Sequence, residues 1–108
     1  FIGCLRDSMQ VKKEKLSTKP YLYYIHRKGC PACVYMDRVL SLQDIKNIVN
    51  KNYKLVTVDV YNQENLPLKS MFTNKTPTFY ILKNKKIVDK FNALEPSNFK
   101  KRLLKNLK

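Results

Sequence analysis

The alternation of apolar and polar residues predicts four strands separated by helices. Two short runs rich in β-branched and aromatic residues predict the first two strands, YLYYIH at 21–26 and LVTVDV at 55–60. The second run is nearly continuous in apolar residues, which is typical of a strand covered on both faces. The segment NKTPTFYIL at 74–82 predicts a turn that leads through Pro77 into a third strand, and KIVDKF at 86–91 predicts a fourth.

Helical spacing of apolar residues predicts the elements between and after these strands. A helix is expected from Pro31, because proline suits the first helical turn, and Ser41 with Asp44 resembles a capping box that restarts it. A short helix is expected at 65–72, and a last one begins at Pro96. The apolar stripes of the two long helical regions are Val34, Met36, Val39, Leu40, Leu42, Ile45, Ile48 and Val49, followed by Phe99, Leu103 and Leu107.

This order of elements predicts an α/β fold. A right-handed crossover makes the first two strands parallel, and a short link in which Asn84 takes a left-handed conformation makes the last two antiparallel. The result is a mixed sheet of about four strands with helices on both faces. The length of 108 residues favours one domain, expected at 19–108, preceded at 1–18 by an arm that is a short helix or a membrane tether.

The positive charge of the chain does not alter the predicted fold and bears only on the possible binding partners. Lys and Arg number 22 against 8 Asp and Glu, which gives a net charge of +14. Such a charge raises nucleic acids, anionic lipids and acidic proteins as partners. However, the lysines are spread along the whole chain, and the aromatic residues are not interleaved with arginine as in a base-stacking surface. This pattern argues against a nucleic-acid partner and leaves acidic substrates or a nearby membrane as weaker indications.

The candidate chemistry lies in the stretch HRKGCPACVY, where Cys30 and Cys33 are two residues apart. Cys30 follows the first strand and opens the first long helix, where free N–H groups and the helix dipole favour an anion. A thiol in that position loses its proton more easily, and Cys33, one turn on, is close enough to close a disulfide. The alternatives are a structural pair or half of a zinc site. Zinc needs four ligands, and the chain offers only Cys4 and His26 besides, at the wrong spacing, so no metal is expected.

The motif CPAC after a strand, a distant Thr-Pro before the third strand, then a hairpin and a terminal helix together resemble the thioredoxin-fold thiol:disulfide oxidoreductases. The resemblance covers residues 19–108. The CPAC motif and the Thr-Pro-Thr sequence look most similar to those of exported, periplasmic bacterial thioredoxin-like proteins and disulfide isomerases. It implies a three-layer sandwich and a cis proline at Pro77. It also implies that Thr76 and Pro77 hold the backbone of an extended substrate beside the sulfurs.

The resemblance also implies a function. Cys30 would be the nucleophile and Cys33 the resolving thiol in exchange with protein thiols or disulfides, aided by a redox partner protein and without metal or organic cofactor. The direction, reduction, oxidation or isomerisation, is not readable from the sequence. The alternative is a redox-inactive binding or assembly module whose cysteines form a structural disulfide.

The chain departs from the thioredoxin pattern at several positions. Tyr24 stands in the first strand where many thioredoxins carry a buried acid that accepts the proton of the resolving cysteine. Gly29 replaces an aromatic residue before the first cysteine, and the late glycines of the family are missing, with Asn92 and Ala93 in that region. These departures make a general cytosolic thioredoxin a poorer match without removing the exchange chemistry.

Three neighbours of the cysteines are candidates for tuning the thiolate. His26 is the only histidine; a protonated imidazole there would stabilise the thiolate, and the alternative is a side chain that points to solvent. Pro31 and Ala32, the two residues between the cysteines, are the other candidates.

The third cysteine, Cys4, lies in FIGC, which resembles the end of a bacterial lipoprotein signal. Lipidation of Cys4 would anchor the protein at the outer side of the inner membrane, with 5–18 as the tether. The alternatives are a trimmed signal peptide or an incidental thiol. An exported, periplasmic or membrane-anchored location is therefore expected, and the cytoplasm is the alternative.

Overall fold

Four strands form one mixed sheet in the order β3-β2-β4-β5. A computed structural model describes residues 19–107; the expected arm at 1–18, with Cys4, lies outside the described residues. The strands are β2 (Tyr21–His26), β3 (Lys54–Asp59), β4 (Thr78–Lys83) and β5 (Lys86–Phe91). The β2–β3 pair is parallel, and β4 is antiparallel to both β2 and β5. The expected α/β fold with a mixed sheet is thereby confirmed.

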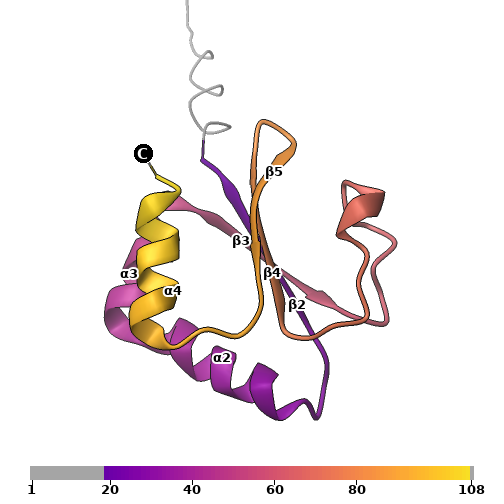
Figure 1. The fold of residues 1–108 in the computed structure, drawn as a ribbon, viewed down its shortest axis with the longest axis horizontal. Coiled ribbons are helices and arrows are strands. Elements are labelled where there is room, and N and C mark those ends of the chain that lie inside the picture. Colours follow the sequence, from indigo (N-terminus) through magenta and orange to yellow (C-terminus); the bar gives the residue numbers. More distant parts are fainter. Residues whose placement is uncertain (1–18, 108) are drawn as a thin grey trace, which may run out of the picture.

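The two faces of the sheet are covered differently. The helices α2 (Pro31–Ser41), α3 (Gln43–Asn52) and α4 (Pro96–Lys105) pack on one face, while the 3-10 helix η1 (Lys69–Met71) and its flanking chain lie on the other (Figure 1). A short helix was expected at 65–72, and only Lys69–Met71, near the end of that range, are helical. Within residues 19–107, no helix combines the length and apolar composition needed to cross a membrane.

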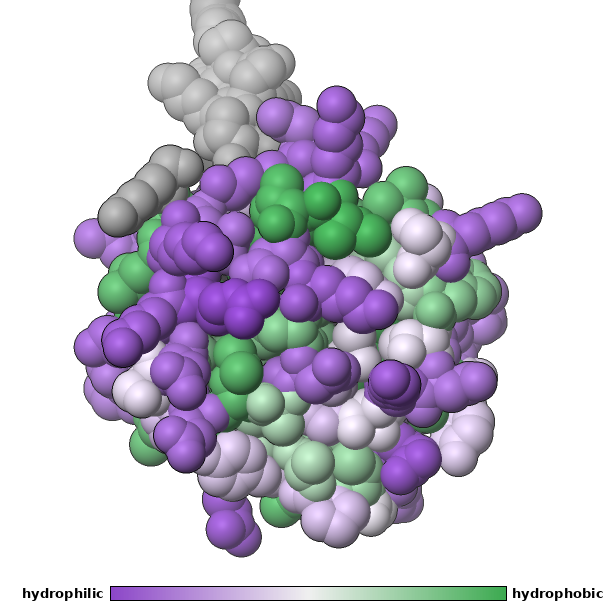
Figure 2. Space-filling view, in the orientation of Figure 1, coloured by the Kyte–Doolittle hydropathy of each residue, from purple (hydrophilic) through white to green (hydrophobic). Residues whose placement is uncertain are grey.

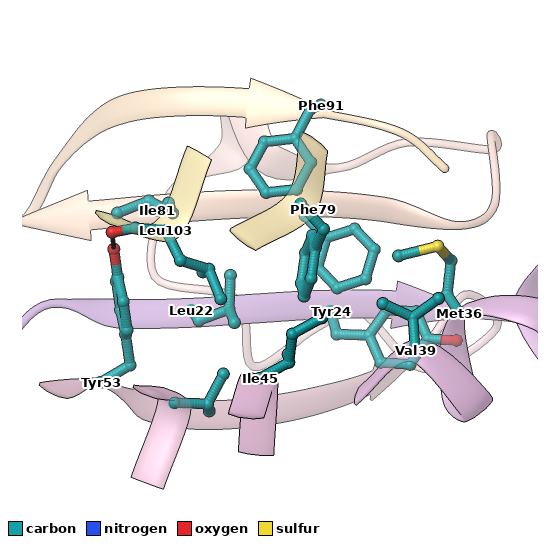
Figure 3. Close-up of a cluster of buried hydrophobic side chains, with 12 residues drawn as sticks. Leu22, Tyr24, Met36, Val39, Ile45, Tyr53, Phe79, Ile81, Phe91 and Leu103 are labelled. Atoms are coloured by element: carbon teal, nitrogen blue, oxygen red, sulfur yellow. Dashed lines mark hydrogen bonds between the residues drawn. The ribbon is translucent and has the colours of Figure 1, made fainter. Parts of the chain in front are cut away.

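The core on the α-helical face is built around Phe79 in β4. Its ring lies 4.6 Å from the Tyr24 ring and nearly parallel to it, and it also contacts the rings of Phe91 and Phe99 (Figure 3). At the other end of this cluster the Tyr53 hydroxyl donates a hydrogen bond of 2.6 Å to the Leu103 carbonyl, which joins the end of α3 to α4. The stack fixes β2 and β4, and therefore the position of Tyr24, against the helices.

The prediction that the second strand is covered on both faces is wrong. No residue of β3 is fully buried: Leu55, with 43% of its surface exposed, and Thr57 are exposed, and Val56 and Val58 are half-buried. An apolar run indicates a strand, but it does not show whether other elements cover its two faces.

The predicted capping box at Ser41 is also wrong. Ser41 is the last residue of α2, and its hydroxyl donates to the Arg38 carbonyl at 2.7 Å. The N-cap of α3 is Leu42, whose extended backbone separates the two helices and whose side chain makes no capping hydrogen bond. Because Ser41 is satisfied by the preceding turn, its hydroxyl is not available to the next helix.

The hairpin between β4 and β5 turns through two left-handed residues, Asn84 with φ 52° and Lys85 with φ 65°. The expected conformation of Asn84 is confirmed, and such turns match the twist of the flanking strands. Hydrophilic residues are spread over most of the face seen in Figure 2, with smaller apolar areas between them. This distribution agrees with lysines scattered along the chain.

Candidate active site

Cys30 lies at the junction that the sequence predicts, between the end of β2 and the first turn of α2. The intervening turn passes through Gly29, whose φ of 83° is in the left-handed region that favours glycine. Cys30 itself is the N-cap of α2, with an extended backbone. An aromatic residue at position 29 would be strained, which gives a local reason for this departure from the thioredoxin pattern.

The Cys30 sulfur receives hydrogen-bond donors from two elements. The Cys33 backbone N–H donates to it at 3.3 Å, and the Thr76 hydroxyl donates at 3.6 Å from the loop before β4. The protonated thiol can instead donate to the Thr76 carbonyl oxygen, 3.8 Å away. Loss of the proton therefore keeps two donors on the sulfur and frees the Thr76 carbonyl for another donor.

The two thiols differ in acidity. Hydrogen bonds from Cys33 and then Thr76 lower the pKa of Cys30 to about 7, against an ordinary thiol value of about 8.5. Burial, and next the hydrogen bond to Cys30, raise the pKa of Cys33. Both cysteines are free thiols, with 4% and 2% of their surfaces exposed. Cys30 is therefore the more acidic thiol of the pair and is partly ionised at neutral pH, whereas Cys33 holds its proton more strongly.

The loop that carries Thr76 is held in place by a side chain that sequence reasoning did not assign. The Thr76–Pro77 peptide bond is cis. Asn92, just after β5, donates to the Pro77 carbonyl at 3.0 Å and to the Thr78 hydroxyl at 3.1 Å. The only signal in the sequence was that Asn92 occupies a region where glycine is usual in the family. Its side chain reaches the Thr76 loop because β5 pairs with β4.

Tyr24 lies beneath the first turn of α2. Its hydroxyl is 2.9 Å from the Cys33 carbonyl oxygen and 2.9 Å from the Asp37 carboxylate. Asp37 was not among the candidate residues. The signal that could have found it is its position four residues after Cys33, on the same side of the helix.

The remaining candidates have different surroundings. The His26 ring lies 5.4 Å from the Tyr24 ring, and within residues 19–107 its side chain makes no hydrogen bond to either sulfur. Pro31 occupies the start of α2, where it needs no N–H partner, and the Ala32 backbone N–H helps to lower the pKa of Cys30. Ala32 thus acts through its backbone.

Two further observations delimit the site. The described part of the chain contains no cluster of three or more His, Cys, Asp or Glu that could hold a metal ion. A hollow of about 450 Å³, lined in part by Tyr21, Tyr23 and Leu82, lies at the opposite end of β2 from the cysteines. This hollow is therefore separate from the groups around the cysteines.

Removal of the Thr76 hydroxyl is expected to make Cys30 less acidic. A Thr76→Val variant keeps the side-chain shape but loses one hydrogen bond to the thiolate, worth about 0.5–1.5 kcal/mol. The midpoint of Cys30 alkylation against pH should therefore move up by about 0.5–1 pH unit. Thr57→Val, on the exposed side of β3, is the matched control and should leave the midpoint in place. An unchanged midpoint in Thr76→Val would show that this hydroxyl does not stabilise the thiolate.

Comparison with solved structures identifies the fold. A thioredoxin from Thermus thermophilus superposes with a TM-score of 0.71 at 24% identity, over 89% of this chain and 82% of that one. A disulphide isomerase from Xylella fastidiosa Temecula1 gives 0.68 at 16% identity, over 96% of each chain. The germline-specific thioredoxin Deadhead from Drosophila melanogaster gives 0.67 at 16% identity, over 87% and 88%. No protein-family model matches the sequence, and no curated protein matches it significantly.

These similarities show that the chain has the thioredoxin fold, as the sequence resemblance implies. At sequence identities of 24% and below, the similarity extends to the fold alone.

Proposed function

We propose that this protein catalyses thiol–disulfide exchange on protein substrates, with Cys30 as nucleophile and Cys33 as resolving thiol. The observation that carries the proposal is the pair of unequal thiols at the start of α2. Hydrogen bonds lower the pKa of Cys30 to about 7, while burial raises that of Cys33. The likeness of the fold to thioredoxins and to a disulphide isomerase supports it.

The reaction proceeds through a mixed disulfide. The Cys30 thiolate attacks a substrate disulfide, a bond forms between Cys30 and one substrate sulfur, and the other substrate sulfur leaves as a thiolate. Cys33 then attacks the Cys30 sulfur, the Cys30–Cys33 disulfide forms, and the second substrate sulfur leaves. The same steps run in reverse when the oxidised protein meets a substrate dithiol, and a redox partner protein restores the starting form.

The Thr76 loop is suited to hold the substrate. When Cys30 is a thiolate, the Thr76 carbonyl no longer accepts from the thiol and can accept an N–H from an extended substrate backbone. The carbonyl oxygen lies 3.8 Å from the reacting sulfur, so a substrate bound there would have its own sulfur close to Cys30. Substrate recognition is thus expected to depend on main-chain contacts.

Alkylation at graded pH tests the assignment of the two thiols. Iodoacetamide modifies the thiolate, so reduced protein should react at Cys30 with a midpoint near the pKa of about 7, and reactivity should fall as pH drops below it. Cys33, whose pKa is raised, should stay unmodified over the same range. Mass spectrometry of the modified peptides separates the sites.

The same protein in urea is the control, because unfolding removes the hydrogen bonds and should return both midpoints to about 8.5. Equal and slow reaction of Cys30 and Cys33 in the folded protein would contradict the proposal.

The burial of both sulfurs favours one alternative, a binding or assembly module with a structural disulfide. The reduction potential of the Cys30–Cys33 pair separates the two functions. A structural disulfide is typically below roughly −300 mV and exchanges slowly with glutathione, whereas an exchange enzyme equilibrates with it readily.

A further inference from the structure

Two basic residues lie in the turn that leads from β2 to the reactive sulfur. The Cys30 N–H donates to the Arg27 carbonyl at 3.2 Å, which closes residues 27–30 into a tight turn through Gly29. Arg27 and Lys28 are both exposed. Their positive charges therefore lie at the surface, within three residues of Cys30.

A third basic residue lies on the other side of the sulfur, in the loop before β4, which begins at the same end of the sheet as α2 (Figure 1). Lys75 is exposed and directly precedes Thr76, whose hydroxyl and carbonyl both contact the Cys30 sulfur. The Lys75 N–H donates to the Thr73 hydroxyl at 3.1 Å, and its carbonyl accepts from the Thr78 hydroxyl at 2.7 Å. These hydrogen bonds fix the backbone of Lys75 beside the site.

The start of this loop is anchored by Gln63. Its side-chain amide donates to the Thr73 carbonyl at 2.8 Å and accepts the Thr73 N–H at 3.1 Å. The same amide donates to the Val60 carbonyl at 2.7 Å, which ties the loop to the chain that follows β3. The loop therefore presents Lys75 at a defined place relative to the cysteines.

The charges of these three basic residues are not neutralised by neighbours. Within residues 19–107, no carboxylate forms an ion pair with any of them. The carboxylates at this end of the sheet accept hydrogen bonds from other groups, Asp37 from the Tyr24 hydroxyl and Asp59 from the Tyr61 N–H. The surface beside Cys30 therefore carries an excess of positive charge.

A substrate cannot react without coming close to these charges. Its own sulfur must reach bonding distance of Cys30, and an extended chain rises about 3.3 Å per residue. Residues within two positions of the substrate cysteine then lie about 7 Å from the sulfur, which is less than the Debye length of about 10 Å at 0.1 M salt. Opposite charges at that separation speed the encounter, and like charges slow it.

We propose that Arg27, Lys28 and Lys75 form a basic rim around Cys30 that selects polypeptide substrates with acidic residues beside the reacting cysteine. This inference rests on the proposed function and names the class of substrate on which it acts. A main-chain contact to the Thr76 carbonyl gives affinity for any extended chain. The basic rim adds the discrimination among side chains that a main-chain contact lacks.

The test uses three synthetic peptides, each closed by one disulfide. They are identical except for the two residues on either side of one cysteine, which are Glu, Ser or Lys. Acid quenching and mass spectrometry give the rate constant for attack by the reduced protein, which carries Cys4→Ser so that only Cys30 and Cys33 react. Each rate constant is divided by that of dithiothreitol with the same peptide, which removes the reactivity of the peptide itself.

The normalised rate with the Glu peptide should exceed that with the Lys peptide by about tenfold or more at an ionic strength of about 20 mM. The ratio should fall toward one in about 1 M salt, where the Debye length is about 3 Å. A variant with Arg27→Glu, Lys28→Glu and Lys75→Glu should bring the ratio to one or below at low salt. A change in the acidity of Cys30 alters the rates with all three peptides alike, so the ratio reports selection.

The matched control reverses three exposed lysines on α3 and α4 and lowers the net charge by the same amount. It carries Lys46→Glu, Lys51→Glu and Lys101→Glu. This variant should keep most of the preference for the Glu peptide, because the basic rim is intact.

Other results would overturn the inference. Either no preference at low salt or a preference that survives the substitutions in the basic rim would do so. A preference lost equally in the control would assign it to the net charge of the chain. Equal rates with all peptides, together with binding to phosphatidylserine vesicles that needs the basic rim, would assign the rim to a lipid surface. Exchange with none of the three peptides would instead count against the proposed function.

Discussion

A Cys30→Ser variant is expected to lose thiol–disulfide exchange, with a rate that falls roughly a thousandfold or more, to background. The serine hydroxyl is not ionised near neutral pH, so the donors that stabilise the thiolate, the Cys33 N–H and the Thr76 hydroxyl, have no anion to act on. The measurement is reduction of insulin disulfides by dithiothreitol, with glutathione exchange as a second substrate.

Cys33→Ser is the matched variant. It keeps the attacking thiolate but lacks the resolving thiol, so it should accumulate a mixed disulfide on Cys30 that mass spectrometry detects. Exchange that survives in Cys30→Ser, or accumulation of a mixed disulfide on Cys33 in the parent protein, would reassign the roles of the two cysteines.

A Phe79→Ala variant is expected to be strongly destabilised, by about 3–5 kcal/mol. Phe79 is fully buried, and its ring contacts Tyr24, Phe91 and Phe99, so truncation opens a cavity between the sheet and α4. For a domain of this size the melting temperature should fall by roughly 12 °C or more. Urea unfolding of the reduced protein followed by circular dichroism measures the change, since the chain has no tryptophan.

Tyr61→Ala is the control for an aromatic residue removed from the surface. Tyr61 is 82% exposed, and its loss should change stability by no more than about 0.5 kcal/mol. A Phe79→Ala protein with a similarly small loss would show that the aromatic stack is not the centre of the core.

Local signals were sufficient to predict the order of the elements and the place of the cysteines. The apolar run at 21–26, the proline at the start of α2 and the left-handed Asn84 each depend on a few adjacent residues. The proximity of Cys30 to Thr76 does not depend on adjacent residues, because the two are 46 residues apart in the sequence. This proximity was expected only because the motifs resemble those of a known family.

The features that were missed depend on how distant elements are aligned. In the sequence, Asp37 cannot be distinguished from the other polar residues on the exposed face of the helix. Its contact with Tyr24 depends on how α2 packs on β2. Asn92 reaches the Pro77 carbonyl because β5 ends beside the start of β4. The outer position of β3 depends on strand order, which an apolar run does not report.

The outer strands of the sheet have a consequence for how copies of the protein meet in solution. Within the described residues, β3 and β5 each have an edge without a neighbouring strand. The unpaired N–H and C=O groups of such an edge can pair with a strand of another copy and cause aggregation. Exposed lysines lie on both, Lys54 on β3 and Lys86 and Lys90 on β5. Since two copies that paired edge to edge would bring these lysines together, with +14 on each chain, like-charge repulsion disfavours the pairing. The basic composition thereby favours colloidal stability.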